Sequence, residues 1–429
     1  MKGRMTHNKP AARYNAADVE HSVEADGAGH GKVHVQEHKV VTERLKWPDA
    51  AKGLSIVGVA LLHVCLEVPH GMDTWLAGLN HLLDPLRMPL FFLVSGYFSV
   101  KVLRFSLREV LSKRIWFFFL PYLVWMPIYL FIKEFEMVRF ADFTHRGAGW
   151  VAMSVLSGEG MYWFLYCLAV FCLFAWATRS LSNPVAVALS LTPLLLQLTP
   201  VSASIVLHFG QYLPIYMIGL RYRSAITWLA RSCTRSGFIV TYVLSGLAAY
   251  TAHHWWQESL RGTALAGLPG RGEGRWGWSS DFFDLIEGLV WRLWLLPTAV
   301  LLAVALASVP LVFSALAFVG RHTLVVYIGH PIALSVLFGM LLRYREGVLI
   351  EPGNGVWASP SLWVIGVFIV VMIACYGFYL LSRVPVIGWT LAPPAIDHLL
   401  PGAAQRSAAT SHQHNTSSAT PTSSAPKRP

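Results

Sequence analysis

The sequence predicts an all-α membrane protein, a polytopic bundle of about ten transmembrane helices. Hydrophobic residues make up 55% of the 429 residues and charged residues only 13%, which is about half the charged fraction of a typical soluble domain. A chain this apolar has too little polar surface to cover itself in water, so the bilayer is its natural solvent. The aromatic content of 13% agrees with this class, because Trp and Tyr favour the membrane–water interface.

Ten apolar segments divide the chain, and most are close to the roughly 20 residues that a bilayer requires. We expect them at residues 50–68, 86–103, 115–133, 161–178, 184–200, 205–220, 237–256, 285–308, 322–341 and 361–381. The fifth and sixth are the least regular, because Pro193, Pro200 and Pro214 interrupt them. Residues 47–390 are expected to form one membrane domain. Residues 1–46 and 400–429 have little to bury and are expected to be disordered cytoplasmic tails.

The positions of the basic residues predict how the bundle is oriented. With both termini in the cytoplasm, the cytoplasmic loops and tails hold more than twice as many Lys and Arg residues as the outer loops. This is the bias of the positive-inside rule, and it accounts for the net charge of +11 without nucleic acid. We therefore expect a multi-pass protein of the cytoplasmic membrane that binds no nucleic acid. The five scattered cysteines lack metal-ligand spacing, so no metal site is expected.

The first apolar segment carries several ionisable side chains, which are costly inside a bilayer and are therefore candidates for function. Lys52 and His63 are eleven positions apart, so they share one helix face and lie about 16 Å apart along the axis. Ser55 belongs to the same stripe. Glu67 lies one turn beyond His63, close enough to orient or charge its imidazole. The alternative is structural: Lys52 reaches the headgroups and His63 hydrogen-bonds to a neighbouring helix.

Four further features point to ligand binding, buried chemistry or packing. Five basic residues between Lys101 and Arg114 would hold either anionic lipid or the phosphates of a soluble cosubstrate. The small pair Ser95-Gly96 in the second segment favours close helix packing. His330 in the ninth segment shares a face with Tyr327. Arg292 in the eighth needs a partner, for which Glu67 and Glu287 are the candidates, although a direct Glu287–Arg292 pair has poor helical register.

Six motifs then occur in order over roughly residues 46–385. They are W-P-D-A-A-K-G-L-S-I followed by His63, M-P-L-F-F-L-V-S-G-Y-F at 88–98, K-R-I-W-F-F-F-L-P-Y at 113–122, M-Y-W-F-L-Y-C-L at 161–168, Y-L-P-I-Y-M-I-G-L at 212–220 and G-R-H-T-L-V-V-Y-I-G-H at 320–330. Together they resemble the acyltransferase-3 family of membrane O-acyltransferases, especially its sugar O-acetyltransferase branch. Two positions depart from the family pattern: Lys52 replaces a more common arginine, and Phe117 lies near the place of a second arginine beside Arg114.

The resemblance implies an acyl-CoA donor, acetyl-CoA in the simplest case, that is reached from the cytoplasm. Its acyl group would pass to a hydroxyl of a carbohydrate or lipid-linked acceptor in the cell envelope. We expect His63 to activate this hydroxyl as a general base or to carry the acyl group briefly, with Glu67 orienting it. Lys52 would stabilise developing charge or the donor carbonyls.

The remaining expected site residues fall into two groups. Those expected at the donor are Arg114, Lys113, Arg108, Ser95 and Tyr97. Those expected at the substrate are Trp163, Tyr327, His330 and Arg292.

Two other function classes compete with this interpretation. A transporter or flippase would use the same buried charges as a polar pathway, and a structural membrane subunit would merely pair them. The chain lacks an internal repeat and its motifs keep their order, which favours the acyltransferase interpretation. The sequence leaves open which acceptor is used and whether the donor carries acetyl or another short acyl group.

Overall fold

The computed structural model describes residues 45–140, 143–158, 160–198, 204–261, 280–343, 359–394 and 396, and every regular element in these ranges is helical. The predicted all-α class is therefore confirmed. Both expected tails, apart from Leu45 and Lys46, lie outside the described residues. The main helices are α1 (Trp47–Glu67), α2 (Trp75–Phe98), α3 (Leu107–Val110), α4 (Trp116–Phe140), α5 (Gly147–Ser157), α6 (Trp163–Ala177), α7 (Asn183–Leu189), α8 (Thr192–Leu195), α9 (Ser204–Arg221), α10 (Arg223–Ser232), α11 (Ser236–Trp255), α12 (Ser280–Ser308), α13 (Pro310–Arg321), α14 (Thr323–Ala333), α15 (Pro360–Leu381) and α16 (Pro385–Leu391).

Five helical stretches within the described residues are long and apolar enough to cross a membrane. They are Trp47–Glu67, Leu107–Arg139, Phe282–Ser308, Thr323–Met340 and Pro360–Leu381. The second joins α3 to α4 through a π-helical turn, η3 (Leu111–Ile115), and the fourth continues α14 into the π-helix η6 (Leu334–Arg343). These stretches identify a membrane protein, and the expected number of ten spans stays a prediction.

The clearest departure from the expected segments is at residues 184–200. Instead of one helix, the chain forms α7, the short α8 and a 3-10 turn at Leu196–Leu198. Pro193 lies in the first turn of α8. Proline has no N–H for a helical bond to the residue four positions earlier, so α7 ends before it and the chain restarts. The second expected segment, 86–103, also begins earlier than predicted, because α2 starts at Trp75. The Thr74 hydroxyl caps this start by accepting a hydrogen bond from the Ala77 N–H at 3.3 Å.

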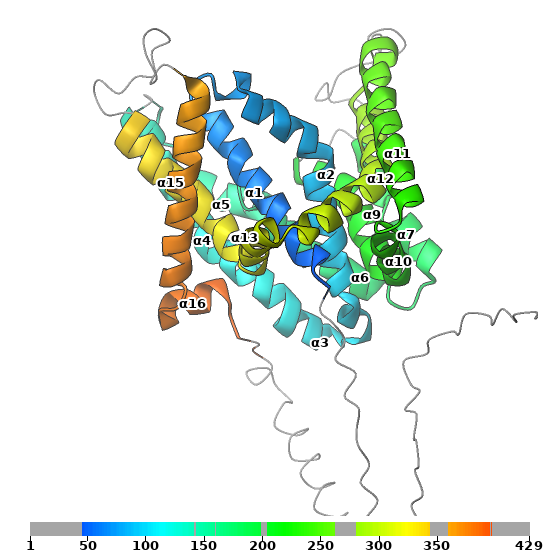
Figure 1. Ribbon diagram of the computed structural model, residues 1–429. Helices are drawn as coiled ribbons and strands as arrows, with labels where there is room; N and C mark the ends of the chain where they lie inside the picture. Colours follow the sequence, from blue (N-terminus) through cyan, green and yellow to red (C-terminus); the bar gives the residue numbers. More distant parts are fainter. Residues whose placement is uncertain are drawn as a thin grey trace, which may run out of the picture. The chain divides into compact units, whose positions relative to one another are not determined.

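Helix α1 lies in the middle of the bundle, between α15 on one side and α11 and α12 on the other (Figure 1). Pro48 and Asp49 occupy its first turn, where a missing N–H and a negative charge are both favourable. Below, the end of the bundle at which α1 begins is called the Lys52 end, and the end at which it finishes is called the Glu67 end. Helices α3 and α16 lie at the Lys52 end (Figure 1).

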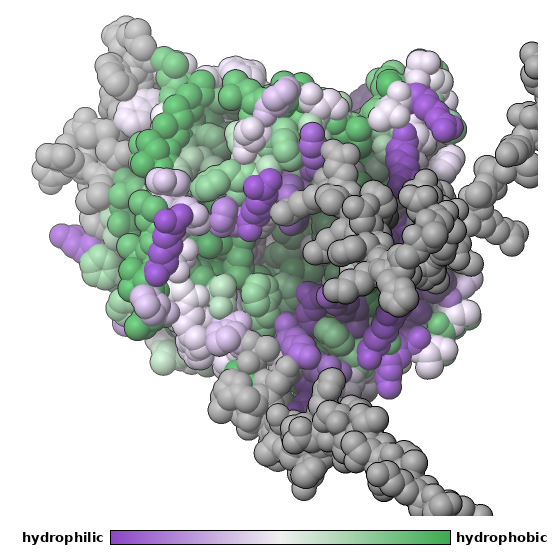
Figure 2. Space-filling model, turned by 60° about the horizontal axis from the view of Figure 1, so that its bottom comes forward, coloured by the Kyte–Doolittle hydropathy of each residue, from purple (hydrophilic) through white to green (hydrophobic). Residues whose placement is uncertain are grey.

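Figure 2 looks toward the Lys52 end and shows hydrophilic residues gathered in patches on this face, with apolar residues over much of the flank. Large apolar side chains such as Phe131, Leu311 and Ile373 are 68%, 83% and 65% exposed. Exposed apolar surface on this scale is unfavourable in water and favourable in lipid. The side-chain distribution therefore agrees with the membrane class inferred from composition.

Two helix pairs in the bundle pack backbone against backbone through glycine. On α2 and α9, Gly96 faces the backbone of Tyr216, and Gly219 faces the backbone of Leu93. On α1 and α13, Gly53 faces Leu316 and Gly320 faces Asp49 in the same reciprocal way. Small residues allow such close approach between membrane helices, so the packing role expected for Gly96 is confirmed.

We predict that Gly96→Ala lowers the thermal stability of the detergent-solubilised protein, because the added methyl group meets the Tyr216 backbone and forces α2 from α9. Overpacking of this kind costs about 1–3 kcal/mol. Gly366→Ala on α15 is the matched control, since nothing lies within 4 Å of its added Cβ. Equal melting temperatures for the two variants would contradict the packing described above.

Candidate active site

A cavity of about 260 Å³ lies among α1, α2, η3, α4, α6, α13 and α14. Three cationic side chains, Lys52, Arg114 and Arg321, line it. Each of them comes from a different element: Lys52 lies in the second turn of α1, Arg114 lies in η3, and Arg321 is the last residue of α13. Ser55, Ser95, Ser99, Thr323 and Tyr327 add hydroxyl groups to the lining, and the other lining residues are apolar. The cavity thus combines a positively charged mouth with an apolar wall.

The carboxylate of Asp49 holds two of these cations in place. Its Oδ1 lies 3.4 Å from Lys52 Nζ, and its Oδ2 lies 3.4 Å from Arg321 Nε. The Asp49 side chain is only 5% exposed, so the two cations offset the cost of burying its charge. One carboxylate against three cations leaves an excess of positive charge. Such a mouth favours an anionic ligand.

Arg321 and Asp49 were not among the site residues expected from the sequence. The expected segments at residues 285–308 and 322–341 leave Arg321 in a loop, whereas the structure places it at the end of helix α13. The signal for Asp49 was present, because it lies three positions before Lys52 and therefore on a neighbouring part of the helix surface. The pairing with Arg321 spans 272 positions of the chain and depends on the close packing of α13 against α1.

A pair of histidines lies beyond the apolar end of the cavity. His63 Nδ1 on α1 and His330 Nε2 on α14 are 2.9 Å apart. Their ring planes are 7° from parallel and their centroids are 5.2 Å apart, so the two rings meet edge to edge through this contact. His330 is 1% exposed and His63 is partly buried. The neighbouring-helix contact considered for His63 is therefore confirmed, and its partner is itself a histidine.

The hydrogen bonds of this pair determine which nitrogens carry protons. His330 Nδ1 lies 3.0 Å from the carbonyl oxygen of Val326, and a carbonyl only accepts, so Nδ1 is the protonated nitrogen of neutral His330. His330 Nε2 is then an acceptor, and His63 Nδ1 donates to it. His63 consequently keeps a lone pair on Nε2. This is the arrangement of a general base oriented by a second residue.

On both α1 and α14, about one helical turn separates the residue that lines the cavity from the histidine. Val59 and Tyr327 line the cavity, and they precede His63 and His330 by four and three positions. The Tyr327 hydroxyl donates to Met161 O at 2.6 Å and accepts from Phe164 N–H at 3.2 Å, which fixes its ring 6.0 Å from that of His330. Tyr327 therefore stands between the cavity and the histidine pair.

A family model described as an acyltransferase domain matches residues 45–380, which is most of the chain and includes every residue of this site. The chain belongs to this acyltransferase family. No curated protein and no solved structure matches it. Membership confirms the resemblance seen in the six motifs and favours acyl transfer over transport or a purely structural role.

Glu67, which helical spacing suggested as the residue that orients His63, binds a lysine of α4, and its role at His63 stays a prediction. Its Oε1 accepts from Lys133 Nζ at 2.8 Å, and the same ammonium lies 3.1 Å from the buried Glu136. His63 Nδ1 is taken by His330. The structure thus brings His63 together with His330, and it places Glu67 in an ion-pair cluster with α4.

The expected donor residues divide into two groups. Arg114 and Ser95 line the cavity with Lys52. Tyr97 does not line it, because this buried side chain hydrogen-bonds to Thr227 Oγ1 on α10 at 3.0 Å. Lys113 pairs with Glu109 at 3.1 Å, and neither it nor Arg108 is part of the lining. The roles expected of these three residues stay predictions.

The expected substrate residues form two neighbouring groups. Tyr327 and His330 belong to the region just described. Trp163 stacks on His208, with centroids 3.9 Å apart, and on Tyr212 at 5.7 Å, while the Arg292 guanidinium lies 6.0 Å from the same Tyr212 ring.

The partner expected for Arg292 was wrong. Glu287 pairs with His253 at 2.8 Å and Glu67 pairs with Lys133, whereas Arg292 Nη1 donates to the Gly288 carbonyl at 2.8 Å. Glu287 lies five positions before Arg292, which puts the two on different parts of the helix surface.

Proposed function

We propose that this acyltransferase moves an acetyl or another short acyl group from acyl-CoA to a hydroxyl of a glycan, glycolipid or related acceptor in the cell envelope. The observation that carries the proposal is the order of groups along α1. A cationic mouth at Lys52 leads into a cavity, and one turn beyond its far end lies a histidine with a free lone pair on Nε2.

The cationic mouth fits the phosphates of acyl-CoA. Arg114 and Arg321 supply planar guanidinium groups, which bind phosphate oxygens through paired N–H bonds. The apolar wall beyond them, which includes Phe91, Phe164 and Leu168, fits the uncharged arm that carries the thioester. Lys52 lies about 16 Å from His63 along α1, so we assign it to donor binding at the mouth rather than to charge stabilisation at the reacting carbonyl.

The proposed reaction follows from the protonation of the histidine pair. His63 Nε2 removes the proton of the acceptor hydroxyl while its oxygen attacks the thioester carbonyl carbon. The C–O bond forms, the C–S bond breaks, and the proton on His63 passes to the CoA thiolate. His330 accepts the hydrogen bond of His63 Nδ1 throughout and holds the imidazole in one orientation. The products are the O-acyl ester and free CoA.

The two substrates would approach from opposite sides. His63 lies four residues, or about 6 Å along the axis, from the Glu67 end of α1, whereas the cationic mouth is at the Lys52 end. We assign the Lys52 end to the cytoplasm, where acyl-CoA is made and where the positive-inside rule puts the basic loops. The Glu67 end would then face the acceptor on the outer side of the cytoplasmic membrane.

We predict that His63→Ala lowers acetyl transfer by about 10²–10⁴-fold, because general-base catalysis contributes this range. The measurement is acetyl-CoA-dependent acylation of native membrane glycans, followed by mass spectrometry. His254→Ala is the matched control, since His254 is 71% exposed at the end of α11. A folded His63→Ala protein with the activity of the His254→Ala control would refute the catalytic role.

We predict that Arg321→Gln raises the KM for acetyl-CoA about tenfold and leaves kcat within about twofold, because it removes a charge-assisted contact to the donor far from the reacting carbonyl. Arg383→Gln serves as the control, since Arg383 binds the Tyr379 hydroxyl after α15 and does not line the cavity. An unchanged KM in the Arg321 variant would place the donor phosphates elsewhere.

A further inference from the structure

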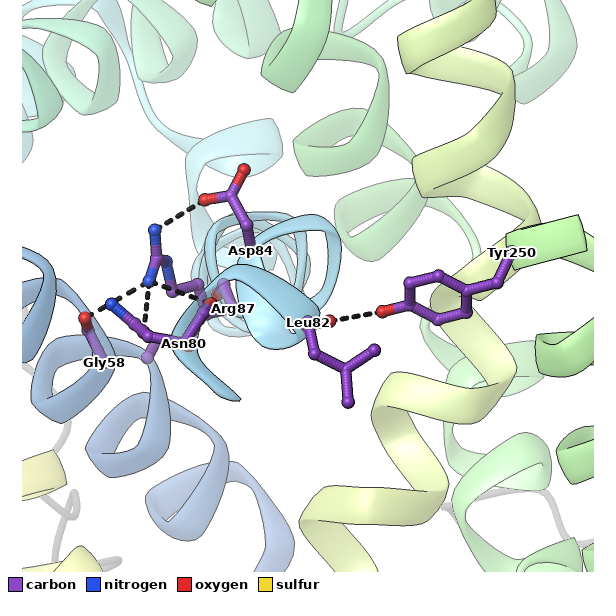
Figure 3. Close-up of polar contacts among 7 residues, drawn as sticks. Gly58, Asn80, Leu82, Asp84, Arg87 and Tyr250 are labelled. Atoms are coloured by element: carbon purple, nitrogen blue, oxygen red, sulfur yellow. Dashed lines mark hydrogen bonds and ion pairs between the residues drawn. The ribbon is translucent and has the colours of Figure 1, made fainter. Parts of the chain in front are cut away.

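A second polar cluster lies on α2 and reaches α1 toward its Glu67 end. Arg87 is 3% exposed, and its guanidinium is shared among three groups (Figure 3). Nη1 donates to the Asn80 side-chain oxygen and to the Gly58 carbonyl at 3.2 Å, and Nη2 lies 2.5 Å from Asp84 Oδ1. Gly58 is five residues, or about 7.5 Å along α1, before His63. The cluster is therefore close to the proposed reaction centre.

Several N–H donors around this cluster have no acceptor among the described residues. Within α2 these are Arg87 Nε and Asn80 Nδ2, and within α12, which packs against α2, it is Arg292 Nε. Asn80 is only 1% exposed. A buried donor without an acceptor is destabilising, and such groups are rare in folded proteins. Three donors on two adjacent helices indicate a ligand that is rich in acceptor oxygens.

The charges of the cluster indicate that this ligand is an anion. Asp84 balances Arg87, but Arg292 has no carboxylate partner within the described part of the chain; its contacts are the Gly288 carbonyl and the face of Tyr212. Tyr212 connects the helices of the two arginines, since its ring stacks on Phe92 of α2 with centroids 4.8 Å apart and lies 6.0 Å from the Arg292 guanidinium of α12. A partly buried cation without a counterion is unfavourable, and a carboxylate or phosphate would supply one.

The cluster reaches the molecular surface and has aromatic rings beside it. The Asp84 side chain is 46% exposed, so the cluster reaches the surface at that point. The partly buried ring of Trp163 stacks against Tyr212 on the other side. Apolar rings with a few convergent polar groups are typical of small-ligand sites, and the Asp84 carboxylate is placed to accept from a hydroxyl.

We propose that Asn80, Arg87 and Arg292 bind an anionic group, a carboxylate or a phosphate, on the hydroxyl-bearing acceptor. The inference rests on the proposed function, because it takes the ligand of this cluster to be the molecule that His63 acylates. It restricts the acceptor to a class: an acidic sugar, or a sugar linked to phosphate. Neutral sugars lack the group that Arg292 would pair with.

The test measures binding to the purified full-length protein in detergent, at constant ionic strength and without acyl-CoA, so it does not depend on transfer activity. The probes are glucose, glucuronate and glucose 1-phosphate, and isothermal calorimetry gives each Kd. We expect glucuronate or glucose 1-phosphate to bind at least tenfold more tightly than glucose, and the tighter of the two identifies the carboxylate or the phosphate as the recognised group.

Variants of Arg292 then separate recognition from folding. Arg292→Gln should abolish the preference for the charged probe, whereas Arg292→Lys, which keeps the charge, should retain the preference with weaker binding. Arg383→Gln is the control and should behave as the wild type. Equal binding of all three probes to the wild type, or a full preference in the Arg292→Gln protein, would overturn the inference. The His63→Ala result stands apart, since it tests acyl transfer itself.

Discussion

The hydrogen bond between His63 and His330 is the interaction on which the candidate site depends. It joins the first membrane helix to α14, late in the chain, at 2.9 Å, and it occurs where water cannot supply alternative partners. Each imidazole N–H needs an acceptor there. The Val326 carbonyl satisfies His330, His330 satisfies His63, and one basic nitrogen is left on His63. The same arrangement that satisfies the buried donors therefore also creates a base.

The remaining charged residues of α1 pair with residues of other helices. These pairs make the two ends of the bundle differ in charge. Asp49 is bracketed by Lys52 and Arg321 at one end, and Glu67 is bound by Lys133 at the other. Buried ion pairs add little net stability, but removing one partner is costly, so these pairs constrain how α13 and α4 pack on α1. The excess cations at the Lys52 end and the free imidazole nitrogen near the Glu67 end separate donor binding from the proposed chemistry.

The sequence was sufficient to predict features that depend on helical periodicity and composition. Lys52 and Ser55 do line one cavity, because positions three or four apart share a helix face. Gly96 packs against another helix, as a small residue in a membrane segment should. The prolines predicted that the stretch at residues 184–200 is irregular, but they did not predict its division into α7 and α8.

The pairings between distant helices were beyond the reach of the sequence. His63 and His330 are 267 positions apart, and each was noted separately without the other as its partner. Arg321 contacts Asp49 only because glycines at positions 53 and 320 let α13 approach α1 backbone to backbone. Arg292 was expected to find a glutamate, yet His253 and Lys133 already occupy both candidates. Periodicity describes one helix at a time, whereas these contacts depend on which helices meet.

The central claim is that His330 orients His63 as a general base, and the kcat of two His330 variants tests it most directly. In His330→Gln the amide oxygen is able to accept from His63 Nδ1 and the amide nitrogen to donate to Val326, whereas His330→Leu removes both bonds. With acetyl-CoA saturating and both proteins folded, the glutamine variant should keep most of the wild-type kcat and the leucine variant should lose about 10²-fold or more. A leucine variant with wild-type kcat would contradict the account.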